Sequence, residues 1–107
     1  MNDVERRALI AEVPHVRNLL GAVFNYDWDL DHEDAEAAYA SVCDDLGAEA
    51  RAEYEREAQV LARKLTSATE VQEFLNLVGS GLAPSLHLGV PLADWPRSLV
   101  RRIQQSK

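Results

Sequence analysis

Apolar residues recur at steps of three and four along most of the chain, which is the spacing of one face of an α-helix. The first such series runs from Leu9 to Val23 and is interrupted by Pro14. Proline lacks an N–H group and disfavours the α conformation at the residue before it. One helix is therefore expected to end at Val13, and a second to begin with Pro14 in its first turn and continue to about Tyr26.

Two further series predict helices in the middle of the chain. One runs over Ala35–Leu46, with Asp31 as the expected N-cap and Gly47 as the expected stop. The other runs over Ala50–Leu65 and carries polar residues on its opposite face. Both patterns are typical of helices that lie on the surface of a globular core.

The last third of the chain contains two recognisable helix starts. Ser67–Glu70 has the form of a capping box and precedes an apolar series over Val71–Val78. Asp94 is followed by Trp95-Pro96, which is a cap followed by a first-turn proline, and the apolar spacing then continues to Ile103. We therefore expect a closing helix that begins at Trp95.

The fold class follows from this periodicity. No segment of five or more residues alternates between apolar and polar positions, and β-branched residues are sparse. A chain of 107 residues has the length of one domain. The sequence thus predicts an all-α fold: one domain over residues 1–107, a single compact bundle of five or six short helices.

The segment Phe74–Ala93 contains no charged residue, but it is a poor candidate for a membrane span. Glycines and prolines within it would leave backbone groups unpaired in lipid. We expect a helix end followed by a long ordered loop. Four leucine side chains are expected to dock this loop on the core: Leu82, Leu86, Leu88 and Leu92.

Composition adds a strong acidic bias. The chain has 18 acidic and 11 basic residues, a formal net charge of −7. Direct nucleic-acid binding requires clustered positive charge, so the composition argues against it. The single cysteine cannot form an internal disulfide, and the first ten residues lack the apolar region of a signal peptide. We therefore expect a cytoplasmic protein.

The negative charge is concentrated in the middle of the chain. Twelve of the 18 acidic residues and two of the 11 basic residues lie between Asn25 and Glu57, so this segment carries −10 and the rest +3. Six acids crowd into Asp27–Glu36. Acids favour the start of a helix, where the helix dipole stabilises them. They also form surfaces complementary to basic partners, which speeds and orients association.

Catalytic motifs are absent from the sequence, so we do not expect an enzyme, a cofactor or a metal. Cys43 adjoins the apolar stripe of its helix and is expected to be a buried, inert thiol. A weaker alternative is a metal-dependent enzyme that uses His32 and Glu36, which are four residues apart. No second cysteine or histidine lies near them in the sequence to complete a coordination shell.

One motif resembles a known family. Phe24-Asn25-Tyr26-Asp27-Trp28-Asp29-Leu30, preceded by Leu19-Leu20-Gly21-Ala22-Val23, is similar to the "LxxLxxxYFHQDWD" signature of small bacterial immunity proteins. These proteins belong to contact-dependent growth inhibition and related polymorphic-toxin systems. The resemblance in the order of elements covers about residues 16–103. Val23-Phe24-Asn25-Tyr26 stands where the signature has Tyr-Phe-His-Gln, and Gly79-Ser80-Gly81-Leu82 replaces a Cys-Tyr-Tyr-like segment.

The resemblance implies a binding protein with no enzymatic activity. Such proteins bind a cognate toxin domain inside the cell and block its active site or substrate surface. The toxins are frequently nucleases, often RNases, with basic substrate-binding faces that an acidic inhibitor can occupy. We expect a monomer when unbound. The alternative from another class is a small helical regulatory or adaptor subunit that binds a different basic protein.

The motif and the acidic segment together supply candidate functional residues. Phe24 and Trp28 are expected in the core, Asp27 is expected to cap the following turn, and Trp95 is expected to be structural. The first candidates for partner contact are Asp29, Asp31, Glu33, Asp34 and Glu36. The second are Asp44, Asp45 and Glu49.

Overall fold

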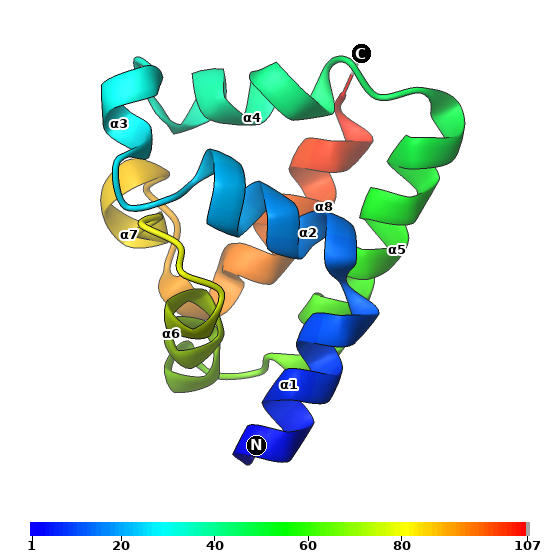
Figure 1. Ribbon diagram of the computed structural model, residues 1–107, viewed down its shortest axis with the longest axis vertical. Coiled ribbons are helices and arrows are strands. Elements are labelled where there is room, and N and C mark those ends of the chain that lie inside the picture. The colour runs from blue at the N-terminus through cyan, green and yellow to red at the C-terminus, as the bar shows by residue number, and fades with distance from the viewer. Residues whose placement is uncertain (107) are drawn as a thin grey trace.

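The chain forms a succession of helices that enclose one core (Figure 1). The structure is a computed structural model that describes residues 1–106, and no strand occurs within that range. The elements are α1 (Asp3–Glu12), α2 (Pro14–Asn18), the π-helical turn η1 (Leu19–Val23), α3 (Trp28–Asp31), α4 (Ala35–Cys43), α5 (Ala48–Lys64), α6 (Ala68–Leu77), α7 (Pro84–His87), the 3₁₀ turn η2 (Leu92–Asp94) and α8 (Trp95–Gln104). The predicted all-α class is confirmed.

The second helix begins where Pro14 predicts but ends earlier than expected. It widens into the π-helical turn η1, in which the Phe24 N–H donates to the Leu19 carbonyl at 2.9 Å. The Asn25 side chain then donates to the carbonyl of Ala22 at 3.0 Å and accepts from the N–H of Asp27 at 2.9 Å. These local bonds compete with helix continuation, so the chain turns before Tyr26.

The start of α4 also differs from the expectation. Asp34 is its N-cap, and its Oδ1 accepts from the Ala37 N–H at 2.8 Å, whereas Asp31 ends the short helix α3. The expected N-cap is therefore wrong by three residues, because a separate helical turn precedes α4. Gly47 does not stop α4, which ends at Cys43; it lies in an extended conformation as the N-cap of α5.

The cap at Ser67 is confirmed. Its Oγ accepts from the Glu70 N–H at 3.2 Å, and the Glu70 carboxylate accepts from the Thr66 N–H at 3.0 Å. Asp94 precedes α8 as expected, but its side chain caps no backbone group and instead pairs with Arg97 at 3.1 Å. A first-turn proline has already removed one N–H that a cap would serve.

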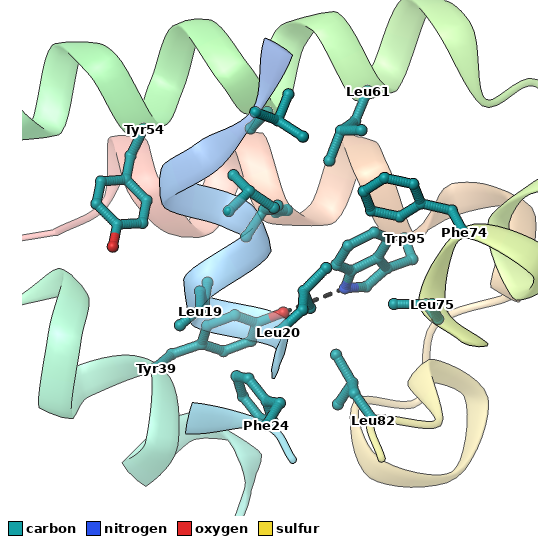
Figure 2. Close-up of a cluster of buried hydrophobic side chains, with 14 of the residues drawn as sticks. Leu19, Leu20, Phe24, Tyr39, Tyr54, Leu61, Phe74, Leu75, Leu82 and Trp95 are labelled. Carbon is teal, nitrogen blue, oxygen red and sulfur yellow. Dashed lines mark hydrogen bonds between the residues drawn. The ribbon is translucent and has the colours of Figure 1, made fainter. Parts of the chain in front are cut away.

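The core lies where α5 and α8 pack against each other and against the helix formed by α2 and η1 (Figure 2). The Trp95 indole N–H donates to the Tyr39 hydroxyl at 3.2 Å, so the polar atoms of both buried aromatic side chains are paired. Large apolar side chains from η1, α5, α6 and the adjoining turns fill the space around this pair: Leu19, Leu20, Phe24, Leu61, Phe74, Leu75 and Leu82. No described helix is long and apolar enough to cross a membrane.

The uncharged segment Phe74–Ala93 forms the end of α6 and an ordered loop, as predicted. The predicted position of one of its leucines is wrong. Leu82 is buried, and Leu88 and Leu92 are partly buried and pack against the core. Leu86 is 78% exposed, so its expected docking is wrong. The reason is the short helix α7: Pro84 is buried, and two residues along a helix turn the side chain about 200° to the other side.

Candidate partner-binding surface

The Asp-Trp motif lies at a corner of the molecule, where α3 meets the loop before α7 (Figure 1). The Trp28 indole N–H donates to the Gly81 carbonyl at 3.3 Å, and the Gly81 N–H donates to the Phe24 carbonyl at 2.7 Å. The Trp28 ring also meets the His87 ring edge-on, with the ring centroids 4.8 Å apart. These contacts join segments more than 50 residues apart in the sequence into one local unit.

Two small residues allow this close approach. A Cβ at Gly81 would lie 2.6 Å from the Asn25 carbonyl oxygen, which is far inside van der Waals contact. The buried Ser80 hydroxyl donates to the Phe24 carbonyl at 3.0 Å and accepts from the Leu82 N–H at 3.2 Å. Residues 80–82 are therefore fixed to the motif by backbone and side-chain hydrogen bonds.

Two of the three aromatic residues of the motif are buried, but its first aspartate is not a cap. Phe24, Trp28 and Trp95 are all buried. The expected capping role of Asp27 is wrong, because its side chain accepts no hydrogen bond at the start of α3. The side chain of Asn25, two residues earlier, instead accepts a hydrogen bond from the Asp27 N–H at this turn. Asp27 is thereby left exposed at the surface.

Four of the five first candidates for partner contact lie on α3 and on the turn that follows it, and the fifth, Glu36, lies on α4. Asp29, Asp31 and Glu33 are exposed, and none of them forms an ion pair with any residue in 1–106. Asp34 is also exposed and caps α4. The structure thus brings together a run of carboxylates without neutralising them.

Two other candidates are neutralised inside the protein. Arg102 of α8 donates to the Glu36 carboxylate at 2.8 and 3.1 Å and to Asp44 at 3.2 Å. Its side chain is only 13% exposed. Glu36 and Asp44 therefore hold α8 against α4. Asp45 and Glu49 lie beyond them, so the eight candidates follow the edge formed by α3, α4 and the start of α5 (Figure 1).

Three exposed apolar side chains accompany the acidic run at this corner. Tyr26 is 71%, Leu30 is 81% and Leu86 is 78% exposed. The other large apolar side chains exposed in the described part of the chain are Val4 and Leu77, on α1 and α6. Apolar periodicity carries no signal for the exposure of Leu30 or Leu86, because α3 and α7 are one turn long and one turn has no period to detect.

One group of side chains has the composition of a metal site. His15, Glu53 and Glu57 place potential ligand atoms within 4.8 Å of one another. Each already has a protein partner: Glu57 pairs with His15 and accepts from the Val16 N–H at 3.0 Å, and Glu53 pairs with Arg56 at 2.8 Å. The cluster therefore serves to hold α2 against α5.

The alternative of a metal-dependent enzyme requires His32 and Glu36 to share a site with further ligands. Glu36 binds Arg102, and neither Glu36 nor His32 belongs to a three-residue group of possible ligands in residues 1–106. Cys43 is fully buried, as expected, and burial raises the pKa of its thiol. A protonated, inaccessible thiol is a poor nucleophile.

Comparison with known proteins gave one match. A family model described as "CdiI immunity protein" matches residues 12–103, which is most of the chain. The matched range extends from the end of α1 to the last turn of α8 and includes the whole corner formed by α3 and α7. Comparison with curated proteins and with solved structures gave no match.

Proposed function

This chain belongs to the CdiI immunity protein family, and from that premise we propose which kind of toxin it neutralises and by which surface. An immunity protein of this family neutralises a toxin of contact-dependent growth inhibition. We propose that the toxin here is a nuclease, and more narrowly an RNase. The acidic edge of α3 and α4 covers the basic surface on which the nuclease binds its substrate.

The observation that carries this proposal is the set of free carboxylates on and beside α3. Asp27, Asp29, Asp31 and Glu33 are exposed and form no ion pair within residues 1–106. Like charges at such spacing repel one another, so they raise the free energy of the unbound protein. A cationic partner removes this cost on binding, which makes these residues better suited to association than to stability.

A nuclease is the class of toxin that such a surface fits. Nucleases bind phosphates through clustered lysine and arginine side chains. Carboxylates on an inhibitor compete with phosphates for the same cations. The inhibitor then needs no catalytic group of its own, and we propose that the chain acts in the cytoplasm, as a monomer before binding, without contacting nucleic acid itself.

Co-expression tests the proposed function. The candidate toxin is the product of the adjacent open reading frame, produced in cells with and without this chain. Cells that produce the toxin are expected to grow only when they also produce this chain. A pull-down should recover a one-to-one complex. The purified toxin should degrade RNA, and equimolar immunity protein should stop the degradation. A toxin that acts on another substrate would contradict the nuclease assignment while leaving immunity intact.

A further inference from the structure

We propose that the toxin-binding surface is centred on the exposed apolar side chains Tyr26, Leu30 and Leu86, at the junction of α3 and α7. The partner that fits is a cationic face of the toxin domain with an apolar depression at its centre. This inference rests on the proposed function and deepens it, because it adds α7 and an apolar centre to a surface so far described only by its charge.

The distribution of exposed apolar area supports this centre. Three of the five large apolar side chains that are exposed in residues 1–106 lie on α7 or within two residues of Trp28. Trp28 and His87 are in ring contact, so these two elements are neighbours in space. A cluster of large exposed apolar side chains is unusual on a soluble protein and marks an interaction site.

The corner is also rigid enough to bind without rearrangement. Beneath the exposed side chains, Trp28 is buried and bonded to Gly81, and Ser80 and Gly81 both donate to Phe24. Turns held in this way lose little conformational entropy when a partner binds. Short helices that would be marginal alone therefore become a preformed binding surface.

The charges around the apolar centre define the chemistry of the partner. Asp27, Asp29 and Asp31 are all exposed and stand next to Tyr26 or Leu30 in the sequence, so carboxylates accompany these two apolar side chains. An apolar centre with a polar rim is the usual anatomy of a specific protein interface. The carboxylates beside Tyr26 and Leu30 are acidic and unpaired within residues 1–106, so the complementary rim on the toxin carries lysine and arginine.

Positive charge is gathered on a different part of the surface, between α5 and α8. This separation supports a cationic partner that docks at the corner of α3 and α7. A groove between α5 and α8 is lined by Arg63, Arg97 and Arg101. A cationic partner is repelled from this groove and attracted to the corner of α3 and α7. Such separation of charge orients two proteins before contact.

The test compares two exposed-leucine substitutions with a matched exposed apolar control. Wild type, the double variant Leu30→Ser/Leu86→Ser, and Val4→Ser are each titrated with the purified toxin domain from the adjacent open reading frame. The double variant is expected to bind at least about tenfold more weakly, mainly through faster dissociation, because central apolar contacts dominate interface energetics. Val4 lies on α1, away from the corner, so Val4→Ser should bind within about twofold of wild type.

The outcomes separate this inference from the proposed function. Circular dichroism and thermal unfolding first establish that both variants keep the wild-type fold, as expected for exposed positions. If wild type binds the toxin and the double variant binds equally well, the proposed centre is overturned and the immunity function stands. If wild type itself does not bind, both are overturned.

Discussion

At the scale of single residues, Glu57 is the most demanding group in the protein, because its carboxylate is completely buried. One oxygen accepts from the Val16 N–H, and the other pairs with His15. A buried carboxylate is tolerated only when its lone pairs are satisfied and a positive or donor group lies beside it. Glu57 therefore joins α5 to α2 at the position where Pro14 begins the second helix.

Substitution of Glu57 is expected to destabilise the fold. In Glu57→Ala the Val16 N–H loses its partner and a cavity remains, which should lower the free energy of unfolding by about 2–4 kcal/mol. Glu57→Gln retains an acceptor of the same shape and should cost less. Urea unfolding followed by circular dichroism measures both variants. Glu53→Gln is the control: Glu53 bonds to exposed Arg56 and solvent screens this pair, so the urea midpoint should stay close to that of wild type.

Cys43 gives a second expectation at this scale. Burial raises the pKa of its thiol, so the folded state keeps the proton to a higher pH than the unfolded state does. The free energy of unfolding should therefore fall as the pH rises above about 8.5, the ordinary cysteine value. At pH 8 a thiol reagent such as DTNB should react with the native protein only as fast as it unfolds. Rapid labelling of the native protein would show that the Cys43 thiol is accessible and would contradict its burial.

Sequence spacing could predict some of these residue environments. Glu57 is three residues after Tyr54 and four before Leu61, both buried, so its position on the inner face of α5 follows from helical geometry. The identity of the cap at the Asp-Trp turn could not be predicted. Asn25 and Asp27 both have side chains suited to it, and the choice depends on how the turn meets Gly81.

At the scale of elements, periodicity predicts the longer helices and is silent on the short ones. The apolar series predicted α5, α6 and α8, although their ends shift by a few residues. The helices α3 and α7 have four residues each, less than the spacing needed to reveal a buried face. Hydrophobicity alone therefore predicts Leu86 in the core, and the candidate surface predicted from the sequence does not include it.

The contact between the two short elements depends on the absence of a side chain at Gly81. In Gly81→Ala the new Cβ would lie 2.6 Å from the carbonyl oxygen of Asn25 and 2.9 Å from the Cα of Tyr26. Both are backbone atoms, so the turn must move, and we expect a loss of about 1–3 kcal/mol in the free energy of unfolding. Thermal unfolding and tryptophan fluorescence, to which Trp28 and Trp95 both contribute, would report the shift.

Gly47→Ala is the matched control for this substitution. A Cβ at Gly47 would meet no atom within 4 Å, and its backbone is extended. Its net cost should be at most a few tenths of a kcal/mol, because the weaker capping preference of alanine is offset by the smaller conformational entropy that alanine loses on folding. Equal effects of the two alanines would show that loss of glycine itself, and not the crowding at Gly81, determines stability.

At the scale of the whole molecule, charge separation was visible in the sequence but its internal neutralisation was not. The −10 segment contains both free carboxylates and the pair bound to Arg102. Arg102 is 66 residues from Glu36 in the sequence, so only the packing of α8 beside α4 reveals which acids are already paired. Charge available to a partner is thus concentrated towards α3.

This concentration predicts how the rate of toxin binding responds to salt. In Asp29→Asn/Asp31→Asn/Glu33→Gln the steering field of the α3 corner is reduced, so the association rate constant at low salt should fall roughly tenfold. Because exposed charges are screened over about 10 Å at 0.1 M salt, the difference from wild type should shrink as salt is added. Stopped-flow mixing with the toxin domain at several salt concentrations measures both quantities.

Position can be separated from net charge by comparing single substitutions. Asp29→Asn and Glu12→Gln each remove one exposed, unpaired carboxylate of residues 1–106, one at the corner and one on α1. If the location of the charge directs association, Asp29→Asn should slow binding several-fold more than Glu12→Gln, since the encounter complex forms at the corner. Equal slowing would mean that the toxin responds to the overall charge of −7 and that the acidic edge has no special place in recognition.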